Sequence, residues 1–405
     1  MNEFDAIVAG AGIWGCTMAR RLAEVGRRVL VLEKRAAIGG NVRCETDPET
    51  GIEIHTYGSH IFHTHIPEVW EFVNRFVSFN GYQHKVLANY KGKVYQLPLG
   101  LNLVNKFFGV ELKPEEVGAF MADETHSAAI FDAFFRGYTS KQWGRPPEAI
   151  DPSIIKRVPV RTNYDTNYFN DYWQGIPSEG YNALFDRLLD HPAITVRCNT
   201  AFSLQTSNSE LQTSNSPQPF NLSTFQPFNL STFQPFNHPT SNFQLPTSNS
   251  STHVFYSGPI DALFGYKFGA LPWRSLRFER ETLNVRDSQG TSVVNYTEAE
   301  VPYTRIHEFK HYHPEGQLVA SGKVAAGSDW GWKSDKTVVM REYPAEWREG
   351  DEPYYPIATP ESAALLAKYQ EEAAKVPNLV LGGRLGQYKY YDMDQAMFAA
   401  LSVKL

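Results

Sequence analysis

The sequence of 405 residues contains only three cysteines, Cys16, Cys44 and Cys198, and they are widely spaced. They form neither a disulfide framework nor a metal-ligand cluster, which favours a reducing cytoplasm. Lys and Arg number 38 against 44 Asp and Glu, so the basic excess of nucleic-acid-binding proteins is missing. No apolar run approaches the roughly 20 residues of a membrane span, and residues 1–5 lack a signal-peptide pattern. These absences predict a cytoplasmic protein with no membrane span and no nucleic acid partner.

Aromatic residues, by contrast, are abundant. The chain has 26 Phe, 21 Tyr and 8 Trp, which together make up 14% of its residues. Its length exceeds the size at which one hydrophobic core usually stops growing, so two or three domains are expected. Some of the aromatic surplus therefore needs an explanation other than a single core.

The N-terminal residues follow the order strand, glycine turn, helix, strand. An apolar segment at 4–9 precedes Gly10, Gly12 and Gly15, a helical pattern follows, and a second apolar segment ends at Glu33. The glycines permit a tight turn in which backbone N–H groups and a helix N-terminus meet a pyrophosphate, and Glu33 can accept hydrogen bonds from a ribose hydroxyl. This pattern predicts a dinucleotide-binding domain of Rossmann type.

A second glycine turn favours FAD as the dinucleotide. Residues 38–41, ending in Gly40 and Asn41, follow Glu33 closely, and simple nicotinamide dehydrogenases lack such a turn. The run at 378–383 ends in another glycine turn, which precedes Arg384 and is placed as a late flavin-contacting turn would be. We therefore predict FAD as the cofactor and a nucleotide fold that returns late in the chain.

The periodicity of apolar residues predicts a multidomain α/β and α+β protein with three folded parts. Helical spacing dominates from about 101 to 143, and alternating, β-rich patterns dominate from 267 to 343. We assign 1–78, 180–202, 253–264 and 376–405 to the FAD-binding domain, 99–150 to a small helical domain, and 79–98, 151–179 and 265–375 to an antiparallel sheet domain.

Residues 203–252 have a different composition. The octet at 220–227 recurs unchanged at 228–235, Glu210 is the single formal charge, and Pro, Asn, Ser, Gln and Thr dominate. Such a segment has little apolar surface to offset its ordering entropy. It is predicted to be a disordered repeat insertion; the alternative is a Phe-rich docking tract.

Several long motifs remain once the glycine turns are accounted for. They include the run Lys141-Gln142-Trp143-Gly144 and lie at 58–64, 137–144, 155–161, 301–305, 341–344, 350–356 and 388–393. Together they closely resemble the bacterial form of the UDP-galactopyranose mutase family. The resemblance covers nearly the whole chain except 203–252.

The resemblance implies both a reaction and its setting. UDP-galactopyranose and UDP-galactofuranose are interconverted on reduced FAD with no net redox change, for galactofuranose-containing surface polysaccharide. It also implies that flavin N5 attacks the anomeric carbon, that UDP leaves as a covalent flavin–sugar adduct forms, and that no side-chain nucleophile is needed. A homodimer involving the helical domain is expected on the same basis.

The resemblance also implies site residues. Residues carried over as catalytic are His60, His63, Trp143, Arg157, Arg274 and Arg305. Residues expected to bind UDP-galactose are His84, Phe135, Tyr138, Thr139, Trp143, Arg157, Tyr168, Asn295, Arg305, Tyr343 and Tyr390. Residues expected to bind FAD are Gly10, Gly12, Trp14, Gly15, Glu33, Lys34, Gly40, Asn41, His60, Ile61, Phe202, Gly383, Arg384, Tyr391, Asp392 and Met393.

Three features need separate interpretation. His60 and His63 lack a third ligand at a recognisable spacing, so no metal site is predicted. The pair Asp351 and Glu352 precedes Pro353 and is interpreted as a turn cap. His84 stands where the family usually has Asn, which puts the sugar contact at that position in question.

Two other functions fit parts of the sequence. A flavin oxidase or dehydrogenase of the amine-oxidase kind shares the glycine turn and Glu33, although it would need a hydride-donor site in place of a UDP site. A catalytically inactive nucleotide-sugar-binding protein would fit the repeat insertion and His84.

Overall fold

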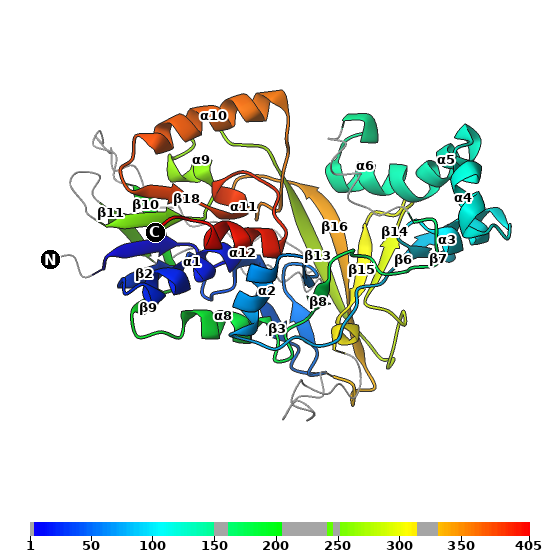
Figure 1. Ribbon diagram of the computed structural model, residues 1–405, viewed down its shortest axis with the longest axis horizontal. Helices are drawn as coiled ribbons and strands as arrows, with labels where there is room; N and C mark the ends of the chain where they lie inside the picture. The colour runs from blue at the N-terminus through cyan, green and yellow to red at the C-terminus, as the bar shows by residue number, and fades with distance from the viewer. Residues whose placement is uncertain (1–3, 150–160, 205–240, 246–251, 314–330) are drawn as a thin grey trace, which may run out of the picture.

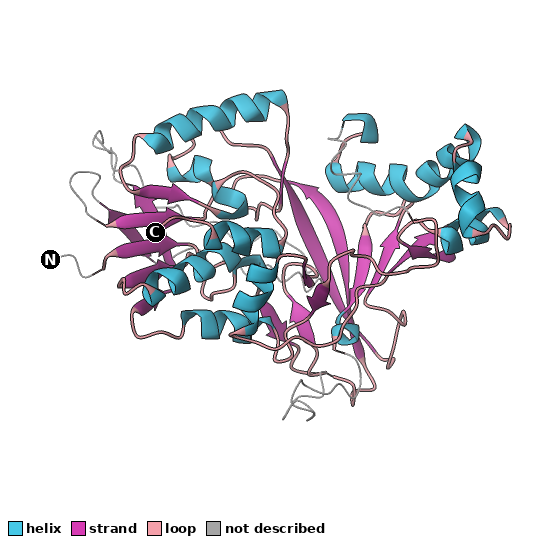
Figure 2. Cartoon of the chain, in the orientation of Figure 1, coloured by secondary structure: helices cyan, strands magenta, loops and turns pink. Residues whose placement is uncertain are grey.

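The computed structural model describes residues 4–149, 161–204, 241–245, 252–313 and 331–405. Figure 1 shows three parts: an α/β unit that holds the N-terminus, a long twisted sheet in the middle, and a group of helices at the far end. Figure 2 shows that helices gather at the two ends and that long strands lie between them.

A parallel five-stranded sheet forms the core of the α/β unit. Its order is β18 (Leu379–Leu381), β12 (His253–Tyr256), β1 (Ala6–Ala9), β2 (Val29–Leu32) and β9 (Ile194–Arg197). The central strands β1 and β2 are buried at every residue, as expected of a parallel sheet covered on both faces. Segments distant in sequence thus build one Rossmann-type sheet, and the predicted late return of the fold is confirmed.

Helices cover this sheet and join it to the rest of the chain. Helix α1 (Ile13–Glu24) packs against α8 (Tyr181–Leu189) and α12 (Met393–Leu401), and buries Trp14, Met18 and Leu22 among others. The remaining helices of this unit are α2 (Pro67–Asn74), α9 (Ile260–Leu263), α10 (Pro360–Ala374) and α11 (Gly383–Gly386). Helices from both ends of the chain therefore share one core.

The central sheet has seven strands. Its order is β17 (Tyr355–Pro356), β13 (Trp273–Leu283), β16 (Thr337–Glu346), β15 (Arg305–Glu308), β14 (Val293–Tyr296), β6 (Val86–Tyr90) and β7 (Lys93–Leu97). The predicted antiparallel sheet is confirmed, with one parallel pair, β6 and β14. The β6–β7 hairpin comes from early in the chain, so no tight turn connects it to β14 and fixes an antiparallel orientation.

The helical part follows β7. It consists of α3 (Leu101–Phe108), α4 (Pro114–Met121), α5 (Glu124–Phe131), a π-helical segment at Asp132–Arg136, and α6 (Gly137–Trp143). Asp123 caps α5 by accepting from the backbone N–H groups of Thr125 and His126. The predicted helical stretch is confirmed, and its last helix, α6, packs against β16 of the central sheet.

Three two-stranded sheets and three short 3₁₀ turns complete the described elements. The strands are β3 (Cys44–Thr46) with β4 (Glu53–His55), β5 (Phe62–Thr64) with β8 (Trp173–Gly175), and β10 (Thr200–Leu204) with β11 (Ser241–Leu245). The 3₁₀ turns lie at Gly40–Val42, Pro147–Ala149 and Phe309–Tyr312.

The β10–β11 pair corrects the predicted extent of disorder. Residues 203–204 belong to β10, and 241–245 form β11, paired in parallel with β10 from Thr200↔Ser241 to Leu204↔Leu245. Low apolar content does not prevent order in these residues, because a short strand can pair with the free edge of another strand without forming a hydrophobic core of its own. The rest of the insertion, 205–240 and 246–251, lies outside the described residues.

Across the described ranges, every helix is too short or too polar to cross a bilayer.

Candidate active site

The first glycine turn forms a cradle between β1 and α1. At Gly15 an added Cβ would lie 1.9 Å from the carbonyl oxygen of Gly10, so only glycine fits there. Gly40 has a φ of +57°, and an added Cβ would lie 2.9 Å from Cα of Gly12, so the second glycine turn closes against the first. Helix α1 begins after Gly12 without a side-chain cap or an acidic residue in its first turn. Its N-terminus suits a pyrophosphate.

Glu33 directly follows β2 and binds the first glycine turn. Its carboxylate accepts from the backbone N–H of Ala11 at 2.8 Å and from that of Arg35 at 2.9 Å, and the residue is 4% exposed. The cradle and Glu33 are the features that an FAD adenosine diphosphate requires, so these residues fit the cofactor.

The other residues expected near FAD gather around the same turns. The ring of Trp14 packs against Gly382, beside the late glycine turn at Gly383. Arg384 donates to the carbonyl of Tyr391, and Asp392 caps α12 ahead of Met393. Phe202 lies within 6.1 Å of the Tyr256 ring on β12, whereas Lys34 is half-exposed.

Two histidines lie near the start of β5. His60 is in the loop before this strand, His63 is on the strand itself, and Ile61 lies between them. His60 donates through Nδ1 to the carbonyl of Gly58 at 2.7 Å, and burial lowers its pKa to about 4, so its ring is neutral at pH 7. His63 lies 2.8 Å from the carboxylate of Asp171 and stacks on Phe169 with ring centroids 3.7 Å apart. Because Nδ1 of His60 is engaged, Nε2 is the atom left to accept a hydrogen bond.

Arg305, on β15, is the centre of a buried polar cluster. It donates to the Tyr138 hydroxyl at 2.6 Å, and its Nε lies 3.2 Å from a carboxylate oxygen of Glu342 on β16. Burial opposes its charge, but Glu342 outweighs burial and raises the pKa of Arg305; in return Arg305 lowers the pKa of Glu342 to about 2 against the effect of burial. Both groups are therefore charged at neutral pH.

The cluster continues toward the 58–63 loop. His307 lies 3.1 Å from the second carboxylate oxygen of Glu342 and contacts the hydroxyl of Ser59, which also receives the Tyr312 hydroxyl. Asn295 pairs with Arg305 in the register of β14 and β15, and is buried. A continuous chain of polar contacts thus runs from Arg305 to the residue before His60.

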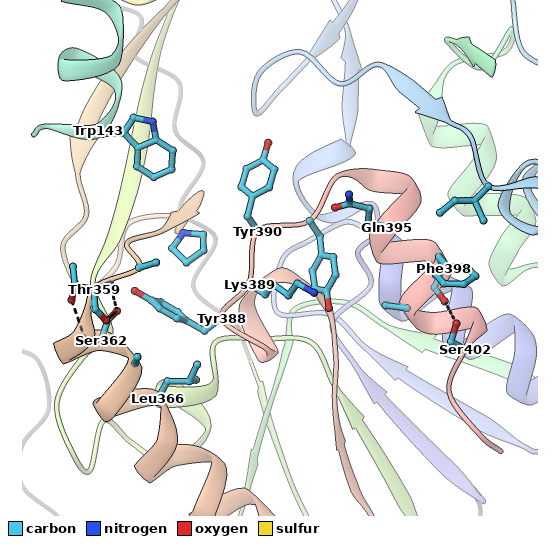
Figure 3. Close-up of a pocket in the computed structure, with 16 residues that line it drawn as sticks. Trp143, Thr359, Ser362, Leu366, Tyr388, Lys389, Tyr390, Gln395, Phe398 and Ser402 are labelled. Carbon is cyan, nitrogen blue, oxygen red and sulfur yellow. Dashed lines mark hydrogen bonds between the residues drawn. The ribbon is translucent and has the colours of Figure 1, made fainter. Parts of the chain in front are cut away.

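An aromatic wall stands beside Arg305. Tyr355, on β17, lies 5.7 Å from the Trp143 ring and stacks with Tyr390 at 6.0 Å, and the guanidinium of Arg384 lies 4.8 Å over Tyr390. Trp143 and Tyr390 also line a cavity of about 850 Å³ between α10, α12 and the 388–391 segment (Figure 3). The wall offers flat faces and hydroxyls next to the guanidinium of Arg305, which is partly buried.

Arg274 positions this wall and is itself 5% exposed. It donates to the carbonyls of Gln142 at 3.0 Å and Lys141 at 3.2 Å, at the C-terminus of α6. The Cβ position of Gly144 lies only 2.7 Å from its guanidinium. Arg274 therefore holds Trp143 in place by binding the end of its helix.

The remaining predicted residues are distributed unevenly. Tyr168 and Phe169 pack on His84, whose Nδ1 lies 2.9 Å from the Tyr82 hydroxyl; Thr139 is buried on α6, and Phe135 stacks on Phe131. Tyr343 is a correction: it lies on the opposite face of β16 from Glu342, and its hydroxyl donates to Glu279 at 2.6 Å. Side chains alternate along a strand, so the neighbour of Glu342 cannot join Arg305. Arg157 lies outside the described residues.

Two residues of the cluster were not identified from the sequence, Tyr355 and Glu342. Tyr355 belongs to the motif at 350–356, and Glu342 directly precedes Tyr343. A strand from 337 to 346 paired with 305–308 would have shown which of Glu342 and Tyr343 shares a face with Arg305.

The comparisons with known proteins agree on a family. A family profile described as UDP-galactopyranose mutase matches residues 133–390, and one described as an NAD(P)-binding Rossmann-like domain matches 8–76. A probable UDP-galactopyranose mutase of Klebsiella pneumoniae is 35% identical over 99% of this chain and 94% of its own. The chain belongs to the UDP-galactopyranose mutase family. This family is FAD-dependent, in agreement with the glycine cradle.

Relatives within and around the mutase family differ in what their names state. A dTDP-fucopyranose mutase of Escherichia coli is 34% identical over 99% of this chain and 97% of its own. A solved structure of a reduced UDP-galactopyranose mutase aligns with a TM-score of 0.65 at 14% identity, covering 99% of this chain and 93% of that chain. A putative protoporphyrinogen oxidase from Exiguobacterium aligns with a TM-score of 0.57 at 13% identity, which shows a shared fold alone.

Proposed function

We propose that this mutase interconverts UDP-α-D-galactopyranose and UDP-α-D-galactofuranose in a redox-neutral reaction that requires reduced FAD. The observation that carries the proposal is the partly buried Arg305 beside Tyr138 and the wall of Trp143, Tyr355 and Tyr390. A partly buried cation among tyrosine hydroxyls matches a diphosphate, and flat rings match a nucleobase.

The substrate contacts follow from this cluster. We assign the diphosphate to Arg305, Tyr355, Tyr390 and Tyr168, with Arg157 as a further candidate from the sequence, and the uracil to Phe135, Tyr138, Thr139 and Asn295. Tyr355 takes the place of Tyr343 in this assignment. Trp143 and His84 are assigned to the sugar, with Arg274 as the positioning residue for Trp143.

The cofactor contacts are assigned to the turns described above. They are Gly10, Gly12, Trp14, Gly15, Glu33, Lys34, Gly40, Asn41, His60, Ile61, Phe202, Gly383, Arg384, Tyr391, Asp392 and Met393. When bound, reduced FAD supplies the nucleophile that displaces UDP from the anomeric carbon.

The residues of the chain contribute positioning and electrostatics. Arg305 stabilises the negative charge that develops on departing UDP, and Glu342 fixes its orientation. Neutral His60 offers an acceptor at Nε2 without adding a positive charge. The aromatic wall excludes water while the sugar is detached from UDP. No side-chain nucleophile is assigned.

The biological setting is part of the proposal. A cytoplasmic enzyme of this kind would supply galactofuranose for cell-surface polysaccharide, and the helical part from α3 to α6 is the surface we assign to a homodimer.

The test is a chromatographic assay of the dithionite-reduced protein with UDP-galactofuranose. We expect UDP-galactopyranose as the product. A parallel reaction with dTDP-fucopyranose measures the activity that the Escherichia coli relative's name describes. Bleaching of oxidised flavin by an amine, or bound UDP with no isomer formed, would instead support an oxidase or an inactive binding protein.

A further inference from the structure

Arg35 lies at the junction of the α/β unit and the central sheet. It follows β2 by three residues, and its backbone N–H already binds Glu33. Its guanidinium reaches Asn41 of the second glycine turn, where Nη2 donates to the side-chain oxygen at 2.7 Å. The same nitrogen donates to the carboxylate of Glu352 at 2.5 Å.

Glu352 comes from the other unit of the molecule. It lies in the loop between β16 and β17, both strands of the seven-stranded sheet. The sequence interpretation of the acidic pair holds for Asp351, which accepts from the backbone N–H of Arg348 at 2.9 Å. Glu352 instead forms an ion pair across the two units, and its side chain and that of Arg35 are each 16% exposed.

One nitrogen of Arg35 is left without an acceptor. Nη1 is enclosed by protein, and no described residue accepts a hydrogen bond from it. The ring of Tyr57 covers the guanidinium at 4.5 Å, so the group is held in one orientation. Burial opposes the charge of Arg35, but Glu352 outweighs it and raises the pKa, so the guanidinium stays protonated. An enclosed, charged donor without an acceptor is costly and calls for a ligand atom.

We infer that Arg35 donates through Nη1 to an oxygen of the adenosine diphosphate half of FAD, and that Glu352 holds it there. This inference rests on the proposed function, since it presumes that FAD binds the glycine cradle. The adenosine half is indicated because Arg35 stands at the carboxyl end of β2, two residues after the acidic residue that binds ribose in such folds. Glu352 thereby makes the central sheet part of the cofactor site.

The inference separates Arg35 from its neighbour Lys34. The side chain of Lys34 is 51% exposed and lies 3.7 Å from Glu352. A solvated ammonium at that distance contributes little, whereas the guanidinium is oriented by Asn41, Glu352 and Tyr57 together.

The test is to titrate FAD-free protein with FAD, ADP or riboflavin and to follow protein fluorescence. We expect Arg35→Met to raise the dissociation constants of FAD and ADP at least tenfold and to leave that of riboflavin within twofold. Arg35→Lys should fall between, because lysine cannot hold Glu352 and reach the cofactor at once. Arg28→Met is the matched control: Arg28 pairs with Asp5 at the start of β2, far from the cradle, and should bind FAD as the wild type does.

Glu352→Ala tests the link between the two units. It should weaken FAD binding at least threefold in the wild type and add nothing in the Arg35→Met background. Far-UV circular dichroism identifies any variant that fails to fold, and Arg35→Lys then carries the test. If the wild type binds FAD and both Arg35→Met and Arg35→Lys bind it with the wild-type affinity, the inference is overturned. Failure of the wild type to bind FAD would overturn the proposed function.

Discussion

Arg305 and Glu342 form an ion pair, 3.2 Å apart, on the buried face of the central sheet. Their strands, β15 and β16, are neighbours, and the register places the two residues directly opposite one another. Glu342 is 3% exposed. Its carboxylate also accepts a hydrogen bond from the Thr304 hydroxyl and contacts the ring of His307. Because the Glu342 carboxylate is buried and held by several partners, it fixes the orientation of the Arg305 guanidinium, which is the requirement for binding a diphosphate in one orientation.

Arg305→Ala should raise the dissociation constant of UDP at least tenfold, because a charge-assisted hydrogen bond contributes about 1.5 kcal/mol or more. Arg305→Lys should recover part of the affinity, since lysine keeps the charge and loses the fork. Isothermal titration of the oxidised protein with UDP measures both. Arg341→Ala is the control, because Arg341 lies on the other face of β16 and pairs with exposed Glu281. Equal UDP affinity in Arg305→Ala and the wild type would contradict the diphosphate assignment.

Arg274 is assigned no contact with UDP, yet Arg274→Met should weaken UDP binding roughly threefold to tenfold. The reason is that the C-terminus of α6 loses two hydrogen bonds beside Trp143. The quenching of tryptophan fluorescence by UDP should shrink in the same variant. Arg277→Met is a control on the same strand, since Arg277 is exposed and covers Tyr343. A variant Arg274→Met with normal affinity and normal quenching would show that Trp143 is held by other contacts.

His84 should make the protein less stable in mild acid. Burial lowers its pKa to about 3, whereas an unfolded histidine titrates near pH 6.5. Between those values the unfolded chain binds the extra proton, so stability falls as the pH drops below about 6.5. From pH 7 to pH 5 this one residue should lower the free energy of unfolding by about 2 kcal/mol. Urea denaturation at both pH values should show a smaller loss for His84→Asn than for the wild type; equal losses would disprove the burial argument.

The β10–β11 pair predicts that two deletions differ. Parallel strands need a crossover connection, so residues 205–240 can be replaced by a Gly-Ser linker of about 12 residues, and β11 is kept. That variant should unfold within about 2 °C of the wild type. Removing residues 241–245 as well leaves the edge of β10 unpaired. This should lower the midpoint of thermal unfolding by a further 2 to 4 °C, which corresponds to a loss of about 1 kcal/mol in the free energy of unfolding. Differential scanning fluorimetry compares them, and equal midpoints would show that β11 contributes nothing.

Local patterns in the sequence predicted much of this fold. The glycine turns at Gly10 and Gly40 and the apolar runs before them specify a strand–turn–helix unit by local geometry alone, and the structure confirms it. Residues whose role depends on strand pairing were harder to predict from the sequence. Tyr343 and Glu342 are adjacent, and only the register with Arg305 decides which one faces the site. Arg35 and Glu352 are 317 positions apart, so their contact depends on how the two units pack.

Redox-neutral mutase activity on reduced FAD is tested most directly by an anaerobic reaction in which the flavin is reduced once and the reductant is then removed. We expect UDP-galactofuranose to be converted to UDP-galactopyranose over many turnovers while the absorbance spectrum of the flavin stays that of the reduced form. Product formation limited to one equivalent per flavin, with reoxidation of the flavin in step, would contradict a redox-neutral mutase.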